Sequence, residues 1–235
     1  TLANYSRFLR TRAGSNEMPD GSGFYFGESH TISDVVLSLV TPRRFVLYLR
    51  GHKRTAVFAI TNECNCRCIM CNMHRQRPIR IPVNQGLRIL DFLYENRFLV
   101  VYFTGGEPTL HPDLTTLVRH ASKLGLITSM TTNGTLPFVV LNRVKEAGLD
   151  VLSVSLDHWD NRICEDLRGH QRIGMKQIST IAHASEIGLR VYALAYLNPI
   201  LCQGKSVETF VKYVNKTLGV PVAFAFPTES DINTY

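Results

Sequence analysis

Short apolar runs that alternate with helix-like stretches are the feature of this sequence that most limits its possible folds. The six runs are continuous rather than alternating in polarity, which is typical of strands buried on both faces of a parallel sheet. Apolar residues recur at helical spacing between them. The runs cover residues 56–60, 99–104, 127–132, 151–156, 189–197 and 222–226, and the helical stretches cover residues 84–97, 113–124, 138–147, 175–187 and 206–218.

This alternation predicts an α/β fold, because parallel strands need crossover connections and helices supply them. We expect a partial (β/α)6 TIM-like barrel of parallel strands, with an open doubly wound sheet as the alternative. Three of the helices are expected to end at Gly125, Gly148 and Gly188, since glycine suits the left-handed position after a helix.

Residues 1–54 are expected to form an N-terminal helical extension, and residues 55–235 are expected to form the core domain. Residues 1–30 predict an irregular arm, and residues 31–50 predict two short helices broken near Pro42. The stretch Thr41–Arg54 holds five of the basic residues and no acid, in a chain of net charge +7. A basic, apolar helix of this kind can lie on an anionic membrane, or it can close the bottom of the barrel.

The sequence predicts a cytoplasmic protein, with peripheral contact at the inner face of the membrane through residues 41–54 as an alternative. It has no apolar run of 18 residues, and its first residues lack the apolar centre of a secretory signal. The positive charge can attract an RNA or another acidic partner. We find no pattern of stacking aromatic residues, so there is no strong nucleic-acid signal.

A dense cysteine cluster follows the first predicted strand. Four of the six cysteines, Cys64, Cys66, Cys68 and Cys71, fall within eight residues, which favours metal or cluster ligation in a reducing compartment. Cys64, Cys68 and Cys71 form a C-x3-C-x2-C pattern, whose three thiolates leave one coordination site open. A zinc site made by Cys66, Cys68, a third thiolate and His74 is the alternative.

Every other polar cluster also follows a predicted strand, at the rim that carries the active site of α/β barrels. Gly105-Gly106-Glu107-Pro108 follows the second run, and Asn133, Asp157 and Asn198 follow the next three. Together with the cysteines, the Gly-Gly-Glu-Pro segment resembles the radical S-adenosylmethionine (radical SAM) superfamily. The resemblance implies that Cys64, Cys68 and Cys71 hold a [4Fe–4S] cluster. Cys66 is then an extra cysteine, expected to be a bystander, with replacement of Cys64 or Cys68 as a ligand as the alternative.

In that superfamily, the open iron binds S-adenosylmethionine, which the reduced cluster cleaves to methionine and a 5′-deoxyadenosyl radical. The radical then abstracts hydrogen from a substrate or adds to it. The resemblance implies that Gly105 and Gly106 bring the backbone close to the cofactor, and that Glu107 accepts a hydrogen bond from its ammonium group. It also suggests further cofactor contacts at Met70, Asn133, Ser155, Arg168 and Asn198.

Two of these residues have structural alternatives. Arg168 is expected either at the carboxylate of the methionine moiety or in a pair with Asp166 or Glu165. Asn198 is expected either at the ribose or adenine, or in a turn with Pro199. No acid–base residue is assigned from the sequence.

The substrate is less constrained than the cofactor. The layout of the chain, with a basic helix directly before the first strand and the cysteine cluster, distantly resembles superfamily members that adenosylate hopene or modify isoprenoid lipids. This resemblance slightly favours a lipid substrate. The alternatives are an enzyme that modifies a peptide or RNA, and a zinc- or cluster-bearing binding module without catalysis. An enzyme would need a low-potential electron donor such as a ferredoxin or flavodoxin. A C-terminal segment that covers the substrate would be missing, since the chain stops soon after the sixth run.

Overall fold

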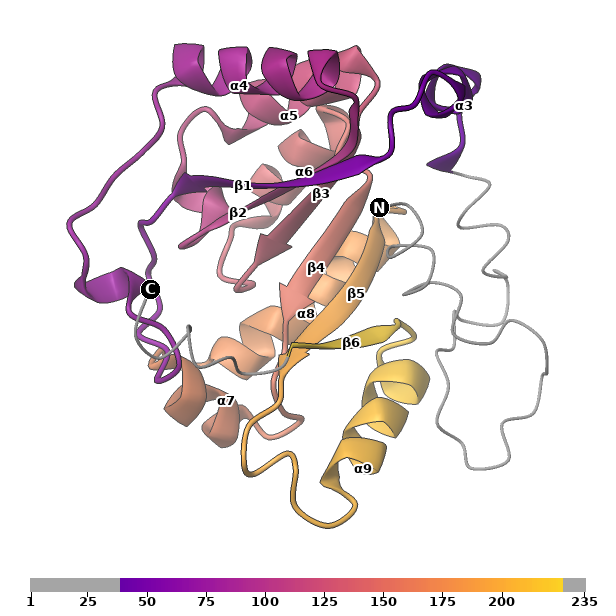
Figure 1. The fold of residues 1–235 in the computed structure, drawn as a ribbon. Helices are drawn as coiled ribbons and strands as arrows, with labels where there is room; N and C mark the ends of the chain where they lie inside the picture. Colours follow the sequence, from indigo (N-terminus) through magenta and orange to yellow (C-terminus); the bar gives the residue numbers. More distant parts are fainter. Residues whose placement is uncertain (1–38, 226–235) are drawn as a thin grey trace.

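Residues 39–225 are described by the computed structural model, and their strands form one six-stranded sheet (Figure 1). Every neighbouring pair of strands is parallel, and the order in the sheet follows the order in the chain. The expected partial TIM-like barrel is therefore confirmed. The strands are β1 (Arg54–Thr61), β2 (Phe98–Gly105), β3 (Ile127–Thr132), β4 (Val151–Ser155), β5 (Arg190–Tyr196) and β6 (Val222–Ala225).

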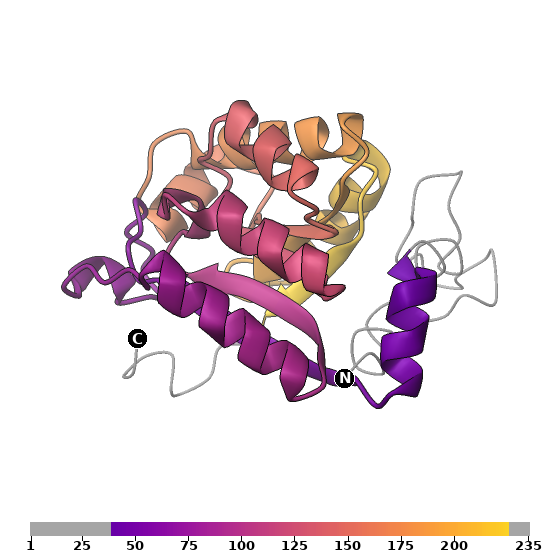
Figure 2. The same cartoon turned by 90° about the horizontal axis from the view of Figure 1, so that it is seen from above.

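Helices cover the outer face of this sheet (Figure 2). Gly125, Gly148 and Gly188 adopt the positive φ angles expected of residues that end helices. The helices are α3 (Pro42–Leu49), α4 (Val83–Glu95), α5 (Leu114–Leu124), α6 (Phe138–Glu146), α7 (Asn161–Arg168), α8 (Ile173–Glu186) and α9 (Ser206–Lys212), with single turns at Met73–Arg75 and Pro108–Leu110 and a π-helical end at Tyr213–Thr217.

Helix α7 is the element that the sequence pattern did not predict. Its eight residues, NRICEDLR, are mostly polar or charged, so the segment is short and has few apolar residues to mark its buried face. The structure shows that its ends are well capped. The side chain of Asp160 accepts a hydrogen bond from the Arg162 amide at 2.8 Å, and Gly169 adopts the left-handed conformation after the last turn.

Helix α3 packs at the amino-terminal ends of the strands. Leu39 and Leu47 join a small buried cluster with Leu99, Ile127 and Val151, each of which lies at or near the start of a strand. This packing matches the interpretation in which the basic helix closes the bottom of the barrel. The irregular arm and the first of the two expected helices fall on residues outside the described range, and the boundary near residue 54 stays a prediction.

A buried ion pair attaches α3 to the barrel. The Arg44 guanidinium donates to both carboxylate oxygens of Asp150, at 2.9 and 2.5 Å, and also to the carbonyl of Leu126 at 3.0 Å. The two side chains are only 10% and 15% exposed. This bidentate contact fixes the helix beside the residue that precedes β4.

Replacing Arg44 with alanine is expected to lower the free energy of unfolding by about 3 kcal/mol or more, because it leaves the Asp150 carboxylate buried without its cation. Arg50→Ala is the matched control, since Arg50 is an exposed cation directly after the same helix. Chemical denaturation of both variants measures the difference. Equal losses would contradict a stabilising role for the pair.

No helix within residues 39–225 is long and apolar enough to cross a membrane.

Candidate functional site

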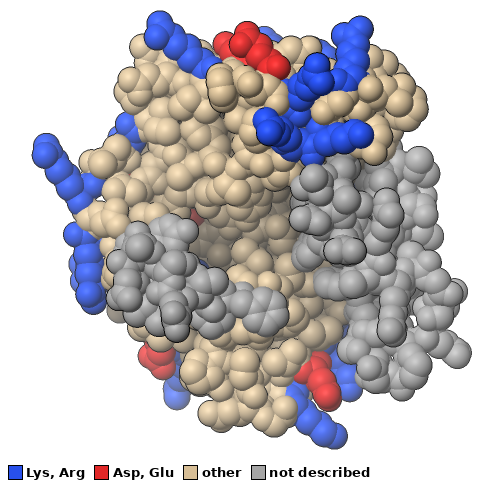
Figure 3. Space-filling view, in the orientation of Figure 1, with Lys and Arg blue, Asp and Glu red and all other residues tan. Residues whose placement is uncertain are grey.

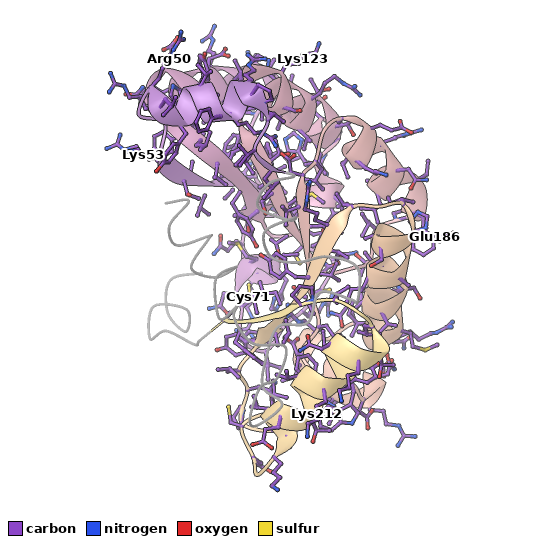
Figure 4. All side chains as sticks on the ribbon, turned by 90° about the vertical axis from the view of Figure 1, so that its right-hand side faces the viewer. Arg50, Lys53, Cys71, Lys123, Glu186 and Lys212 are labelled. Atoms are coloured by element: carbon purple, nitrogen blue, oxygen red, sulfur yellow. The ribbon has the colours of Figure 1, made fainter. Side chains whose placement is uncertain are left out.

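The carboxyl ends of the strands bring the predicted site residues to one rim of the barrel. The molecule is hollowed at its centre in the view of Figure 3, and part of an acidic residue is visible inside the hollow. Cys71 lies in the loop after β1, well away from Arg50 and Lys53 at the other end of that strand (Figure 4). The basic segment and the cysteine loop are therefore at opposite ends of the barrel.

All six cysteines are free thiols, and the four in the loop differ in exposure. Cys64 and Cys71 are half-buried, whereas Cys66 and Cys68, at 2% and 9% exposed, both belong to the main core. Two of the predicted ligand sulfurs accept backbone N–H groups within the loop. The Cys66 amide lies 3.4 Å from Cys64 Sγ, and the Met73 amide lies 3.5 Å from Cys71 Sγ.

Cys66 affects its neighbours through its own thiol. A hydrogen bond from Cys66 lowers the pKa of Cys64, and the same donor, followed by the charge of Arg168, lowers the pKa of Cys68 to about 6. The hydrogen bonds with these two sulfurs, followed by burial, raise the pKa of Cys66 itself. Burial raises the pKa of Cys71.

The glycines at the end of β2 allow two backbone segments to touch. A Cβ atom at Gly105 would collide with the carbonyl oxygen of Thr61, and one at Gly106 would collide with that of Glu63. The Gly106 amide donates to the Thr61 carbonyl at 2.8 Å, and the Glu107 amide donates to the Glu63 carbonyl at 2.7 Å. The glycines therefore seat the beginning of the cysteine loop against β2, in addition to any contact with a ligand.

Glu107 is completely buried, and its carboxylate joins β2 to β3. It accepts hydrogen bonds from the Thr109 hydroxyl at 2.6 Å, the Thr132 hydroxyl at 2.9 Å and the Asn133 amide at 2.6 Å. Burial raises the pKa of this carboxyl group, while the hydrogen bonds act in the opposite direction. These contacts hold the rim in place. The expected contact of Glu107 with the cofactor ammonium stays a prediction.

Asn133 connects the end of β3 to the cysteine loop. Its Nδ2 atom donates to Asn65 Oδ1 at 2.8 Å and lies 3.9 Å from Cys64 Sγ, while its Oδ1 atom accepts the Thr135 amide at 2.9 Å. The structure therefore brings Asn133 next to a predicted cluster ligand.

Three other residues predicted to contact the cofactor lie in different surroundings. Asn198 makes hydrogen bonds within its own turn, to the Leu201 amide at 2.9 Å and to the Tyr196 carbonyl at 3.2 Å, as its structural alternative expects. Ser155 is 9% exposed at the end of β4, and Met70 is half-buried against the core. Contacts of these three residues with a cofactor stay predictions.

Arg168 forms an ion pair that the sequence did not predict. Its partner is Asp157 after β4, at 2.5 Å, rather than the nearby Asp166 or Glu165. Its Nη1 atom lies 3.8 Å from Cys68 Sγ. The motif positions pointed to both residues separately, but only the fold brings them together beside a predicted cluster ligand.

The donor set fits a [4Fe–4S] cluster. Three thiols on one loop each have an N–H donor within 3.9 Å of the sulfur, as thiolate ligands require. Within residues 39–225, no three His, Cys, Asp or Glu side chains converge on a point where one metal ion could sit. In a [4Fe–4S] cluster each cysteine binds a different iron, so the three sulfurs need not meet at one point.

Comparisons with known proteins agree with this geometry. The family model described as the radical SAM superfamily matches residues 58–216. A probable GTP 3′,8-cyclase of Sulfolobus acidocaldarius is 31% identical over 141 residues, which cover 59% of this chain and 45% of the cyclase. An Fe-coproporphyrin III synthase of Methanosarcina barkeri is 30% identical over 120 residues, which cover 49% of this chain and 30% of that protein.

A similar fold is found in the structure of Streptococcus suis SuiB bound to S-adenosylmethionine. The TM-score is 0.66 at 20% sequence identity, and the match covers 97% of this chain and 50% of SuiB. The chain thus spans half or less of the length of each of these proteins.

Proposed function

Because the chain belongs to the radical SAM superfamily, whose members use a [4Fe–4S] cluster and S-adenosylmethionine, we propose that Cys64, Cys68 and Cys71 hold that cluster. When both groups are bound, they supply reductive cleavage of S-adenosylmethionine and a 5′-deoxyadenosyl radical for reaction with a substrate. The observation that carries the proposal is the cysteine loop itself. Its three predicted ligand thiols have N–H donors at their sulfurs, and the start of the loop is hydrogen-bonded to the Gly-Gly-Glu segment within the matched region.

The residues of the rim have distinct proposed tasks. Gly105 and Gly106 are half-exposed, so their backbone groups can face the amino group of S-adenosylmethionine. Glu107 keeps the ends of β2 and β3 together through its buried carboxylate. Asn133 orients Cys64 through its amide nitrogen. Ser155, Met70 and Asn198 line the same rim as further candidates for cofactor contacts.

The concave face of the sheet favours a polar substrate over a hydrocarbon. The hydroxyl groups of Tyr102 on β2 and Ser153 on β4 lie 3.3 Å apart, and Ser153 donates to Thr131 on β3 at 3.2 Å. Tyr102 and Thr131 are partly exposed. A substrate with hydrogen-bonding groups, such as a peptide or a nucleotide, can add hydrogen bonds to these hydroxyl groups, whereas a lipid tail would cover them and offer none.

The basic helix whose position before the first strand favours a lipid substrate is α3. That helix contacts the opposite end of the strands from the cysteine loop. We therefore prefer the polar alternative, and contact of residues 41–54 with a membrane is not part of the proposed function. An electron donor of low potential, such as a ferredoxin or flavodoxin, would reduce the cluster.

Anaerobic reconstitution tests the proposed function. The protein should bind close to four irons and four sulfides per chain, and after reduction it should convert S-adenosylmethionine to 5′-deoxyadenosine, measured by mass spectrometry. An unreduced sample is the control. One bound zinc and no cluster would overturn the assignment of the ligands and favour the binding-module alternative. A complete cluster that yields no 5′-deoxyadenosine would overturn the catalytic part.

A further inference from the structure

We propose that Arg168, held in place by Asp157, positions Cys68 and sets the reduction potential of the cluster by its charge. The inference rests on the proposed function, since it requires a cluster at Cys68. It gives Arg168 a different task from the contact with the methionine carboxylate that the sequence suggested.

The ion pair leaves one side of the guanidinium directed at the cysteine loop. Arg168 Nε and Nη2 donate to the two oxygens of Asp157 at 2.5 and 2.9 Å, and the remaining nitrogen, Nη1, lies 3.8 Å from Cys68 Sγ. The Arg168 side chain is 14% exposed, and the Asp157 side chain is 0% exposed. A planar guanidinium held at two points has little freedom to leave the sulfur.

The backbone of α7 also contacts the loop on both sides of Cys68. The Arg67 amide donates to the Arg168 carbonyl at 2.9 Å, and the Ile69 amide donates to the Leu167 carbonyl at 3.0 Å. At Gly169, a Cβ atom would lie 2.7 Å from the Arg67 carbonyl oxygen. The end of α7 and the residues around Cys68 therefore form a single hydrogen-bonded unit.

Asp157 fixes this unit to the barrel. One of its carboxylate oxygens accepts the Tyr196 amide at 2.9 Å in addition to the Arg168 side chain. Asp157 lies just beyond the end of β4, and Tyr196 is the last residue of β5. Through these contacts, the position of Cys68 depends on two strands that lie far from the cysteine loop in the sequence.

The charges give the pair an electrostatic effect as well as a structural one. Reduction of the cluster adds one negative charge next to Cys68. A cation beside the ligand sulfur favours the reduced state, and the more distant carboxylate opposes it. Since both side chains are largely removed from solvent, salt screens this effect weakly. Removing the cation and removing the carboxylate should therefore shift the potential in opposite directions.

Redox titration of the reconstituted protein, followed by electron paramagnetic resonance, tests the proposal. Arg168→Gln should make the reduction potential more negative by ~59 mV, which corresponds to a tenfold change in the equilibrium constant for one-electron reduction. Asp157→Asn should make it less negative. Arg168→Lys keeps the charge but loses the two-point contact with Asp157, so it should shift the potential less than Arg168→Gln does. Arg162→Gln, which removes an exposed cation from the same helix, is the matched control and should cause no shift.

Shifts of Arg168→Gln and Asp157→Asn in the same direction, or no shift in variants with complete clusters, would overturn the inference. If Arg168→Gln fails to assemble a cluster, then Arg168→Lys and Asp157→Asn still decide the matter. In that case, the inference requires a shift smaller than ~59 mV for Arg168→Lys and a potential less negative than that of the unmodified protein for Asp157→Asn. Absence of a cluster from the unmodified protein would instead refute the proposed function.

Discussion

Cys71→Ala is expected to lose the cluster and to reduce 5′-deoxyadenosine formation by more than about 100-fold. Removing a residue that only hydrogen-bonds to a metal ligand typically costs about 10- to 100-fold in metal affinity or activity, and removing the ligand itself should cost more. Cys64→Ala and Cys68→Ala should behave in the same way. Iron and sulfide analysis after reconstitution, together with mass spectrometry of the reaction, measures both effects.

Cys66→Ala is the matched control for these variants. Cys66 is in the same loop, and at 2% exposed it is the most deeply buried of the four cysteines there. Its replacement should keep the cluster and cost roughly 1 kcal/mol of stability through the small cavity that it leaves. If Cys66→Ala lost the cluster and Cys64→Ala or Cys68→Ala retained it, our choice of ligands among the four cysteines would be wrong.

The sequence predicted the fold well wherever burial is continuous along a segment. Residues 127–132 were predicted as a strand with the bounds that β3 has, because both faces of that strand are buried. Helix α7 was missed for the opposite reason. Only Ile163, Cys164 and Leu167 are apolar among its eight residues. Much of the sequence signal for this helix lies in the residues that cap it, Asp160 and Gly169.

The candidate site shows a similar limit. Its residues could be grouped from the sequence, since parallel strands end at the same edge of a sheet. The partners of each side chain could not be predicted in this way. Arg168 had two acidic neighbours in the sequence, yet it pairs with Asp157 and lies beside Cys68, which is 100 residues away. Such contacts depend on how loops from different strands pack, and local spacing carries no information on that packing.

Gly105→Ala is expected to lower the free energy of unfolding by more than about 4 kcal/mol, which is an exceptional value for one substitution. Two causes act together. Gly105 has a φ angle of +135°, which side chains rarely adopt, and its Cβ atom would collide with the Thr61 carbonyl at the beginning of the cysteine loop. That carbonyl also accepts the Gly106 amide, so the collision would separate the loop from β2. Chemical denaturation and the iron content after reconstitution should both report the change.

Gly204→Ala separates the two causes. Gly204 also has a positive φ angle, +52°, but no atom lies within 4 Å of the position of its Cβ. Its replacement should cost only the backbone strain, about 1–2 kcal/mol, and should leave the iron content unchanged. Equal losses in the two variants would mean that Gly105 is needed only for its backbone angles. A much larger loss at Gly105, together with loss of iron, would show that the contact between β2 and Thr61 holds the cysteine loop in its binding position.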